Sequence, residues 1–362
     1  MASKLDLTGL TEYVPKAVMD LKEVIKQELF KESDLSKIVT IEDGIAYSER
    51  VGYMGELGDI GYKSANTGCD LNEVTVSAST VQKTWAPEFY DSRIILCKDN
   101  IDREIGRLGL KKGIDMYDMT ESDYYDMFID EFKKSLLKMY NRLIWMSDKQ
   151  AENVNVSPSA GRITAGVEKK LFTTNEGLFK RLRQIVAASP DQKVTIAANA
   201  QSTYATQKST LTAAVAMTIA KKLYNDADLN IKTRIRNGEF VAKCTLDFWD
   251  KLAENYTGYE LETMFKNQQD GVKRVSVLGL EFEAVPEWDF MINKFENTGT
   301  KWIEPHRVVL YSKDNALFGV PSTRTWGMFD AFFERKDRKI YIDLKDAYDT
   351  MFLHDNLVMY AV

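Results

Sequence analysis

The sequence predicts an α+β protein built from two or three units, and three observations carry this prediction. Residues 122–149 show the longest unbroken helical pattern in the chain. The preceding residues 39–96 are polar and extended in character, with six glycines between positions 44 and 68. The residues after the helix alternate short helix and strand patterns. The 362 residues also exceed what one hydrophobic core usually holds, about 250 to 300 residues.

The pattern at residues 122–149 predicts an amphipathic helix that acts as a spine between the two regions. Its apolar side chains recur every four residues, at Phe128, Phe132, Leu136, Tyr140 and Ile144. Asn141 and the lysines at positions 133, 134 and 138 fall outside this apolar face. Ser122 is the predicted N-cap. At 1.5 Å per residue the helix would span roughly 40 Å.

Composition bounds the class of protein. The hydrophobic content of 44% and charged content of 28% are ordinary for a globular protein. A net charge of -6 argues against a surface devoted to nucleic acid. The three cysteines are widely spaced, which fits a reducing compartment and excludes a CxxC motif. The N-terminus lacks a signal-peptide pattern, and no run approaches 18 apolar residues. We therefore expect folding in a cytoplasm and no membrane partner.

Residues 13–32 predict a first amphipathic helix. Its apolar stripe consists of Val18, Leu21, Val24, Ile25 and Leu29. Because a non-helical stretch follows it, one interpretation is an arm that packs on something other than its sequence neighbours. The other interpretation, a terminal helix docked on its own domain, is equally compatible with the pattern.

The glycine-bearing region predicts a long two-stranded ribbon. Residues 41–51 and 72–85 have strand patterns, and residues 52–71 form the loop between them. Such a ribbon is only marginally stable alone. Its aromatic side chains Tyr47, Tyr53, Tyr62 and Trp85 have no local core to fill, and aromatics of this kind mark contact surfaces. We therefore expect the ribbon to lie on a neighbouring surface, such as that of another subunit.

The remaining patterns predict short elements in a mixed order. Residues 93–110 read as a strand leading into a helix near 100–108, and a capping box of Thr173 and Glu176 predicts a helix that ends at residues 189–191. Further helices are predicted at 209–225, 248–255 and 259–267. Strands are predicted at 193–200, 231–235, 240–245, 274–285 and 306–311, followed by a hairpin at 329–347 and a last strand at 356–362.

No catalytic constellation is visible in the sequence. His306 and His354 are the only histidines, and no HExxH, GxSxG or HxxxH motif accompanies them. The stretch GELGDIGYKS at residues 55–64 resembles a phosphate-binding loop, but Tyr62 separates the last glycine from Lys63. We predict no catalytic, cofactor-binding or metal-binding residue and no cofactor.

Two groups of charged residues leave weaker alternatives. The carboxylates Asp115, Asp118, Glu121, Asp123, Asp126, Asp130 and Glu131 would suit a divalent metal, but their position at a helix start explains them more simply. Basic clusters are scattered along an acidic chain, which fits solvated faces and intersubunit ion pairs. They remain compatible with weak, nonspecific attraction to enclosed DNA.

The order of these parts resembles the major capsid proteins of tailed double-stranded DNA bacteriophages, whose fold is shared with encapsulins. The most similar stretches are residues 81–102, VQKTWAPEFYDSRIILCKDNID, and 276–292, SVLGLEFEAVPEWDFMI. Residues 306–320 and 329–362 resemble the closing segments of the family. The resemblance is architectural, covers nearly the whole chain and rests on no diagnostic motif.

The resemblance implies five regions. They are an N-terminal arm at 1–38, an extended hairpin loop at 39–92, a peripheral domain with the spine helix at 93–165, an axial α/β domain at 166–320, and C-terminal strands returning to the peripheral domain at 321–362. Some members crosslink a hairpin lysine to an asparagine. Lys63 lies in a suitable loop, but nothing marks its partners, so that chemistry is not expected here.

The function implied is that of a structural, non-enzymatic shell protein. It would self-assemble into the pentamers and hexamers of an icosahedral virion head in the cytoplasm of a bacterial host. Its partners would be further copies of itself, scaffolding, portal and other head proteins, and packaged double-stranded DNA in nonspecific contact. Two alternatives stay open: an encapsulin-like compartment, and a soluble α/β enzyme that uses a divalent metal at the carboxylates of residues 118–131.

Overall fold

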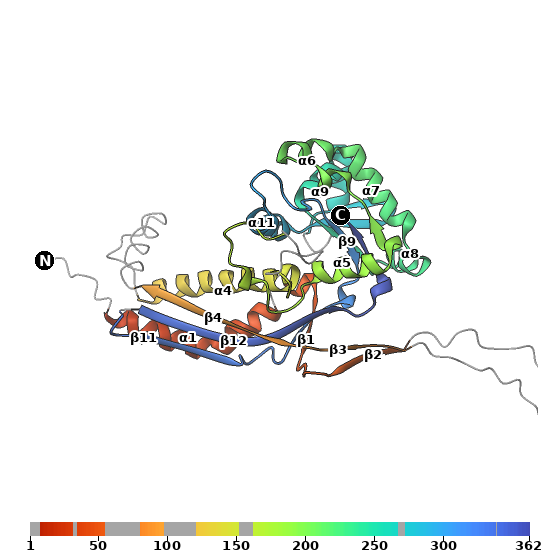
Figure 1. Ribbon diagram of the computed structural model, residues 1–362. Helices are drawn as coiled ribbons and strands as arrows, with labels where there is room; N and C mark the ends of the chain where they lie inside the picture. Colours follow the sequence, from red (N-terminus) through yellow and green to blue (C-terminus); the bar gives the residue numbers. More distant parts are fainter. Residues whose placement is uncertain are drawn as a thin grey trace, which may run out of the picture.

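The computed structural model describes residues 8–31, 35–54, 80–97, 121–151, 162–266, 272–337 and 339–362. These residues form an elongated body and a compact body that lies on one side of it (Figure 1). A thin hairpin projects from one end of the elongated body, and the C-terminus lies in the compact body. The three parts are described in turn.

The elongated body is built on a sheet that is five-stranded within the described residues. Its central strand is β12 (Lys339–Phe352), which pairs antiparallel with β4 (Glu88–Cys97) on one side and β11 (Met328–Glu334) on the other. The far end of β12 pairs with β10 (Ala316–Val320), and β1 (Thr40–Asp43) lies parallel to β10. The length of β12 thus joins two groups of strands into one surface.

Two long helices cover one face of this sheet. They are α1 (Thr8–Lys31), which contacts β11 and β12, and α4 (Glu121–Met146), which packs on α1. A short helix, α2 (Leu35–Ile38), links α1 to β1. Every second residue of these strands points to this face, so exposed and buried side chains alternate along most of β11. Burial of these side chains is the main term that holds the body together.

The first helix docks on its own chain. Val18, Ile25 and Leu29 are at most 4% exposed, and Lys26 is fully buried against Asp346 of β12. Residues 18–31 therefore do not form a free arm that locks under another subunit. The second interpretation of the sequence is the one observed, because β11 and β12 return from the far end of the chain to provide the surface.

The predicted spine helix is present, with shifted ends. Phe132, Leu136, Tyr140 and Ile144 are at most 4% exposed, as the four-residue repeat predicted. The helix begins at Glu121, so Ser122 is not its cap, and it ends at Met146. Asn141, predicted outside the apolar face, is 6% exposed because α5 and the chain after the helix cover its last turns.

The compact body contains a sheet that is six-stranded among the described residues. Its order is β5 (Lys193–Val194), β13 (Val358–Ala361), β9 (Val308–Tyr311), β6 (Val241–Cys244), β8 (Leu280–Ala284) and β7 (Arg274–Val277). The parallel pair β6–β8 and the antiparallel neighbours make it a mixed sheet. Its central strands β9 and β13 are buried throughout, which fits coverage on both faces.

Helices surround this second sheet. They are α5 (Leu178–Ala188), α6 (Tyr204–Thr210), α7 (Ala213–Asp226), α8 (Leu229–Arg236), α9 (Leu246–Ala253), α10 (Gly258–Lys266) and α11 (Pro286–Phe295). The short 3₁₀ turns are η1 (Lys169–Leu171), η2 (Pro190–Gln192), η3 (Ala197–Ala200), η4 (Lys313–Asn315) and η5 (Asp355–Leu357). One core lies between α7, α9 and the sheet.

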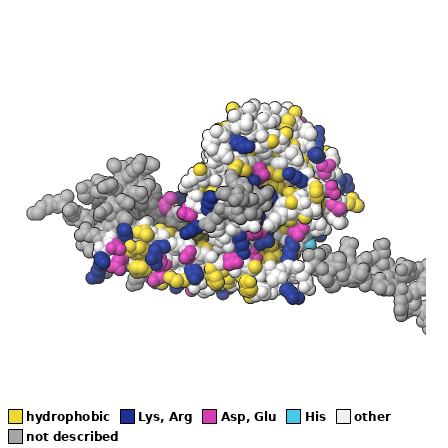
Figure 2. Space-filling model, viewed as in Figure 1, with side chains coloured by type: hydrophobic (Ala, Val, Ile, Leu, Met, Phe, Trp, Pro, Cys, Tyr) yellow, Lys and Arg dark blue, Asp and Glu magenta, His cyan; other side chains and the backbone are white. Residues whose placement is uncertain are grey.

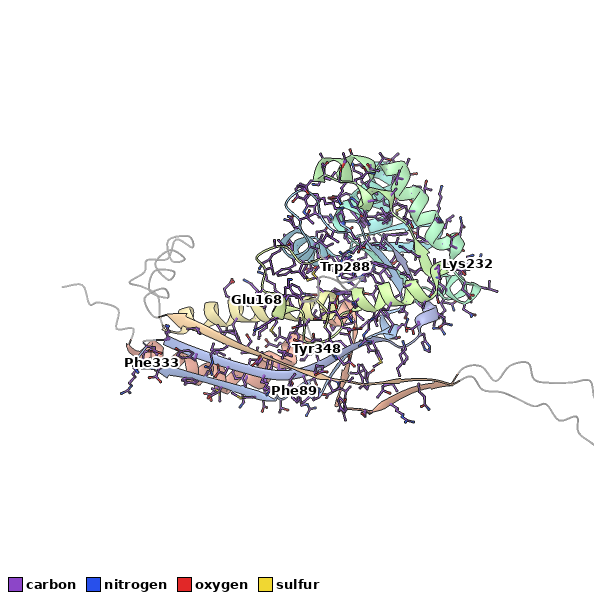
Figure 3. All side chains as sticks on the ribbon, in the orientation of Figure 1. Phe89, Glu168, Lys232, Trp288, Phe333 and Tyr348 are labelled. Atoms are coloured by element: carbon purple, nitrogen blue, oxygen red, sulfur yellow. The ribbon has the colours of Figure 1, made fainter. Side chains whose placement is uncertain are left out.

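The two bodies share a continuous aromatic core. Trp145 of α4 lies with its ring centroid 4.6 Å from Trp288 of α11 and 5.0 Å from Phe179 of α5. Figure 3 labels Trp288 in the compact body and Tyr348 in the elongated one. Both belong to the same cluster of buried residues. The bodies are therefore packed on each other rather than joined by a linker.

Several predicted elements are corrected. The strand expected at 41–51 is two strands, β1 and β2 (Arg50–Met54), which pair with different partners. Residues 231–235 form part of helix α8, because Asp228 caps it and the pair Ile231 and Ile235 faces the core at helical spacing. Helix α11 was not predicted as a helix. The expected helix near 100–108 lies outside the described residues.

Two further corrections concern ends of elements. The cap of α5 is Gly177 with no side-chain hydrogen bond, so Thr173 and Glu176 do not form a capping box for it. The last strand, β13, pairs with β9 and β5 in the compact body, whereas residues 321–362 were expected to return as a whole to the elongated one. Only β11 and β12 of that segment do so. The apolar pattern of 358–361 specifies a buried strand but not which sheet receives it.

Candidate functional site

The root of the projecting hairpin is a small apolar cluster at one edge of the elongated body. Ile45 and Trp85, on the two arms of the hairpin, pack with Leu317 of β10 and Met351 of β12. Gly319 makes this possible, since a Cβ there would lie 2.8 Å from Ile45 Cδ1 and 2.9 Å from the Trp85 ring. The indole of Trp85 therefore lies directly over the β10 backbone, and it is 2% exposed.

Polar contacts fix the direction of the hairpin at its root. Ser48 N donates to Trp85 O at 2.9 Å, and Trp85 N donates to Glu49 O at 2.8 Å. The Lys83 ammonium donates to Phe352 O and to Asp355 Oδ1, the latter at 2.6 Å. These contacts join both arms of the hairpin to each other and one arm to the end of β12. Among the described residues, these contacts hold the hairpin at its base.

Beyond the root, the described part of the hairpin is a separate two-stranded sheet. Strands β2 and β3 (Thr80–Thr84) pair only with each other there, with Tyr53 opposite Val81. Figure 1 shows the pair extending away from both bodies. A two-stranded ribbon is marginally stable alone, and its two outer edges carry unpaired backbone groups. A ribbon with this geometry is suited to packing on another surface, which would pair its outer edges.

The second candidate surface is the face of the sheet that α1 and α4 leave open. Its apolar members are Phe89 and Ile95 of β4, with Met328 and Phe332 of β11, and they are 37 to 69% exposed. Phe89 is labelled in Figure 3, and Figure 2 shows hydrophobic side chains lying between charged ones along the elongated body. Exposed apolar groups gathered on one face are typical of contact surfaces. We call this set the open sheet face.

Charged side chains fix the positions of the aromatic side chains on the open sheet face. Arg93 donates two hydrogen bonds to Asp343 at 2.6 Å each, and its guanidinium lies 5.8 Å from the Tyr341 ring centroid. Tyr341 in turn stacks on Phe332 at 5.4 Å. The Lys345 ammonium lies 5.3 Å from the Phe89 ring. Cation–π and bidentate contacts of this kind hold side chains in place before any partner binds.

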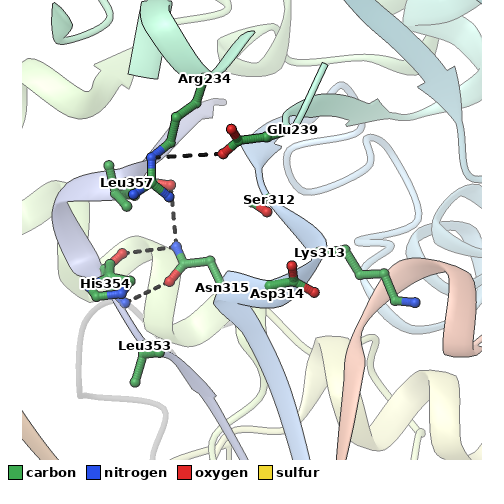
Figure 4. Close-up of a pocket in the computed structure, with 9 residues that line it drawn as sticks. All are labelled: Arg234, Glu239, Ser312, Lys313, Asp314, Asn315, Leu353, His354 and Leu357. Atoms are coloured by element: carbon green, nitrogen blue, oxygen red, sulfur yellow. Dashed lines mark hydrogen bonds and ion pairs between the residues drawn. The ribbon is translucent and has the colours of Figure 1, made fainter. Parts of the chain in front are cut away.

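A pocket of about 430 Å³ lies where the end of α8 meets η4, η5 and the residues just after β12 (Figure 4). Asn315 closes its floor by exchanging hydrogen bonds with the backbone of His354 at 2.6 and 2.9 Å. Arg234 and Glu239 face each other at 4.0 Å across its rim. Burial, then Arg234 and Lys83, lower the pKa of His354, which keeps the imidazole neutral near pH 7.

Both histidines have structural positions. His306 is 1% exposed, and its backbone exchanges hydrogen bonds with the Asn199 side chain at 2.8 and 3.0 Å. Burial lowers the pKa of His306. It precedes β9, whereas Ser312 of the pocket follows β9, so His306 lies at the other end of that strand from the pocket. The structural reading of both histidines agrees with these contacts.

The other sequence candidates are spread out or lie outside the described residues. The loop at 55–64 with Lys63, and Asp115 and Asp118, are outside them. Asp130 is exposed, and Glu131 pairs with Lys134 at 2.8 Å. Among the described residues, no three His, Cys, Asp or Glu side chains are grouped to hold a metal ion. Within the same residues, no helix is long and apolar enough to cross a membrane.

Sequence reasoning found the ribbon but missed the open sheet face. The alternation of β11 and β12 was recognised, yet Phe89 and Ile95 belong to a strand that was predicted only from residue 93. A period-2 pattern begins at Phe89, with Tyr90, Ser92 and Ile94 on the inner side. This pattern is visible in the sequence. Pro87, however, indicates a break in the ribbon, so no strand was predicted to begin directly after it.

The fold is similar to a solved phage structure over nearly its whole length. The procapsid of satellite phage P4, solved with its size determination protein, matches with a TM-score of 0.54 at 8% sequence identity. The match covers 94% of this chain and 98% of that one. The chain has the fold of phage capsid proteins. The predicted α+β fold class, with its long spine helix and hairpin loop, is confirmed at the level of the fold.

Other solved phage structures match with lower scores. A structure from Mycobacterium phage Ogopogo matches at 10% identity over 91% of each chain, with a TM-score of 0.46. The capsid of Myoviridae phage XM1 matches at 8% identity over 91% of this chain and 90% of that one, with a TM-score of 0.45. The sequence matches no protein-family model and none of the curated protein sequences.

Proposed function

We propose that this chain is a structural shell protein that assembles into an icosahedral phage head around double-stranded DNA. The observation that carries the proposal is the match to the P4 procapsid over 94% of the chain. The ribbon of β2 and β3 supports it independently, because in the described residues the two strands pair only with each other, and their outer edges suit a contact with another chain. The protein is then not an enzyme, and its place is the capsid of a virion.

Each part of the fold has a role in this proposal. Residues 39–92 carry the hairpin that lies over a neighbouring subunit, and residues 93–165 with β11 and β12 form the peripheral domain around the spine helix. Residues 166–311, together with β13, form the axial domain that meets its copies at the centre of a pentamer or hexamer. Strand β10, expected in that domain, belongs to the sheet of the peripheral domain instead. Of the N-terminal region, helix α1 (Thr8–Lys31) remains on the peripheral domain, since it docks on β11 and β12 there.

Assembly is the experiment that tests the proposal. The chain is expressed alone and together with any neighbouring scaffold gene, and particles are measured by light scattering and negative-stain microscopy. Closed shells, capsomer rings or tubes are expected. Enclosed DNA would support a phage head, and enclosed protein cargo would point to an encapsulin-like compartment. A stable monomer or dimer under both conditions contradicts the proposal.

The partners follow from the proposed role. The main partner is a second copy of the chain, contacted through the ribbon and the open sheet face. Scaffolding, portal and other head proteins would join during assembly in the bacterial cytoplasm, and packaged DNA would make nonspecific contacts with basic side chains. Particles purified with nuclease and analysed by mass spectrometry should contain this chain as the dominant protein. A minor share in the particle would contradict the assignment as the main shell protein.

A further inference from the structure

A buried cluster of charged groups lies where α5, α11 and β9 meet. Arg162 donates to Glu304 at 2.6 Å and to Glu296 at 3.3 Å. Arg307 pairs with Glu296 through Nη2, and its Nε donates to Glu304 O at 2.9 Å. Arg183 of α5 approaches Glu304 with Nη1 at 4.0 Å from Oε2, which is too long for a hydrogen bond.

The cluster contains more positive than negative charge in the described part of the chain. Its members are three arginines and two glutamates, of which Arg307 is 0% and Glu296 is 4% exposed. Burial favours the neutral acid, but Arg162 and Arg307 outweigh it and hold the pKa of Glu304 to about 2, so this carboxylate is charged. One positive charge has no counter-charge. Because a buried charge is costly unless paired, this imbalance needs an explanation.

The neighbouring acids do not supply the missing charge. Burial raises the pKa of Tyr360 to about 12, so its phenol is neutral at physiological pH. Asp289 is the next carboxyl that interacts with Arg307, and burial raises the pKa of Asp289 to about 7. It also accepts the backbone hydrogen bond of Leu246 at 2.8 Å. Asp289 is therefore at most half ionised near neutral pH and is engaged elsewhere.

The donors left over by these pairs belong to Arg183, Arg307 and Tyr360, and the Tyr360 hydroxyl interacts electrostatically with both arginines. Within the described residues, Arg183 Nε and Nη1, Arg307 Nη1 and the Tyr360 hydroxyl are buried and have no hydrogen-bond partner. Arg307 lies over the Phe179 ring at 4.5 Å, and the Tyr360 ring stacks on the same Phe179 ring at 6.5 Å between centroids. Tyr360 and Arg307 are both 0% exposed. Buried donors left unpaired cost free energy, and together they form a set suited to an anion.

We propose that this cluster binds one small monovalent anion, of the size of chloride or formate, between Arg183, Arg307 and Tyr360. A single negative charge restores the balance, and the four unpaired donor atoms on these three side chains supply its ligands. The side chain of Glu304 is 26% exposed and marks the side from which solvent reaches the cluster. A water molecule would pair with the donors but would not neutralise the charge. Stability should therefore depend on the type of anion in solution if an anion binds, and should not if water occupies the cluster.

Thermal unfolding of the purified chain tests the site. The unfolding temperature is measured as chloride replaces gluconate at constant ionic strength, because gluconate is too large for the cluster. Bound anion stabilises the folded state by mass action, so the unfolding temperature should rise and then level off. General salt effects work in the opposite direction, since strongly hydrated anions stabilise proteins more than chloride does.

Two variants on α5 separate the site from ordinary ion pairing. Arg183→Met removes the surplus charge, so the chloride-dependent shift should disappear while stability in gluconate is kept or raised. Arg181→Met is the matched control: it breaks the 2.9 Å ion pair with Asp349, lowers stability in every salt and keeps the chloride-dependent shift. Bromide in crystals should give anomalous scattering beside Arg183.

Three outcomes overturn the proposal. They are an unfolding temperature of the unmodified chain that does not depend on chloride, an equal chloride effect in Arg183→Met, and bromide found away from the cluster. The first measurement uses only the unmodified chain, so it decides the question even if Arg183→Met does not fold.

Discussion

Gly177 is the point where the start of α5 comes closest to the end of α4. Its N–H donates to Ser147 O at 2.7 Å. A Cβ at this position would lie 2.7 Å from Ser147 N and 2.8 Å from the Trp145 carbonyl carbon, and both are backbone atoms that cannot move aside. Gly177→Ala should therefore lower the free energy of unfolding by about 1 to 3 kcal/mol, the usual cost of overpacking.

Gly258 provides the control for this substitution. It begins α10, and a Cβ there would meet nothing within 4 Å. Gly258→Ala should change the free energy of unfolding by no more than about 0.5 kcal/mol, as at most surface positions. Urea unfolding followed by tryptophan fluorescence measures both variants. Equal effects of the two substitutions would show that the close approach at Gly177 does not decide its identity.

Asp289 gives the protein a specific dependence on pH. Burial raises its pKa from the ordinary 3.8 to about 7, so the folded state holds a proton that the unfolded state releases. Stability from this group is therefore fully present below about pH 4 and is lost as pH rises toward 7. Asp289→Asn keeps an acceptor for Leu246 N and should remove this loss.

Urea midpoints at about pH 5 and pH 8 measure the effect. The unmodified protein should lose more stability between the two values than Asp289→Asn does. Asp191→Asn makes the same change at an exposed position and should behave like the unmodified protein. Identical pH profiles for Asp289→Asn and the unmodified protein would rule out a raised pKa at Asp289.

At the scale of elements, one buried ion pair joins α1 to the sheet. Lys26 pairs with Asp346, donates to Thr325 O at 2.8 Å and lies 4.7 Å from the Trp326 ring centroid. Burial lowers the pKa of Lys26 and raises the pKa of Asp346, so the pair is held in spite of its desolvation cost. Lys26→Met leaves Asp346 buried and unpaired, and should cost about 3 to 5 kcal/mol of unfolding free energy.

The double variant Lys26→Met/Asp346→Leu separates the pair from the packing around it. Replacing both partners with apolar side chains of similar size should recover most of the lost stability, because no charge is then left in the core. Denaturant unfolding of the two single variants and the double variant gives the coupling energy. Additive losses would mean that the two groups stabilise α1 separately.

The elements also show where pattern reading succeeded. The hairpin of β11 and β12 was predicted because Ile340, Ile342 and Leu344 alternate with polar residues, and all three are at most 2% exposed. Residues 231–235 alternate in the same way over a shorter run and were misread as a strand. A run of five residues fits the period of a strand and the period of a helix equally well. The N-cap at Asp228 and the burial of Ile231 and Ile235 show that this run is part of helix α8.

At the scale of the whole molecule, the ribbon should be needed for assembly and not for folding. Its root residues Ile45 and Trp85 lie outside residues 52–71, and both large cores lie away from them. Deleting residues 52–71 should therefore leave the secondary structure and the unfolding temperature of the isolated subunit unchanged. Shell formation should be lost, because the contact to the neighbouring copy is removed.

Circular dichroism and negative-stain microscopy measure these two properties on the same preparation. Trp85→Ala is a useful comparison, since it loosens the root while the ribbon itself is kept. It should reduce the yield of shells less than the deletion does. Normal particles from the deletion variant would contradict an intersubunit role for the ribbon.

By itself, the sequence determined the elements whose patterns are local and long. The helix at 121–146 and the hairpin of β11 and β12 repeat one period over enough residues to fix both the type of element and its buried face. Tertiary structure alone decided which surfaces these elements meet. The docking of α1 on strands some 300 residues away, the pairing of β13 with β9, and the arginine cluster from three separate segments depend on contacts between distant residues. Local periodicity carries no information about such contacts, because an apolar face or a charged group can be satisfied equally well by any of several partner surfaces in the chain.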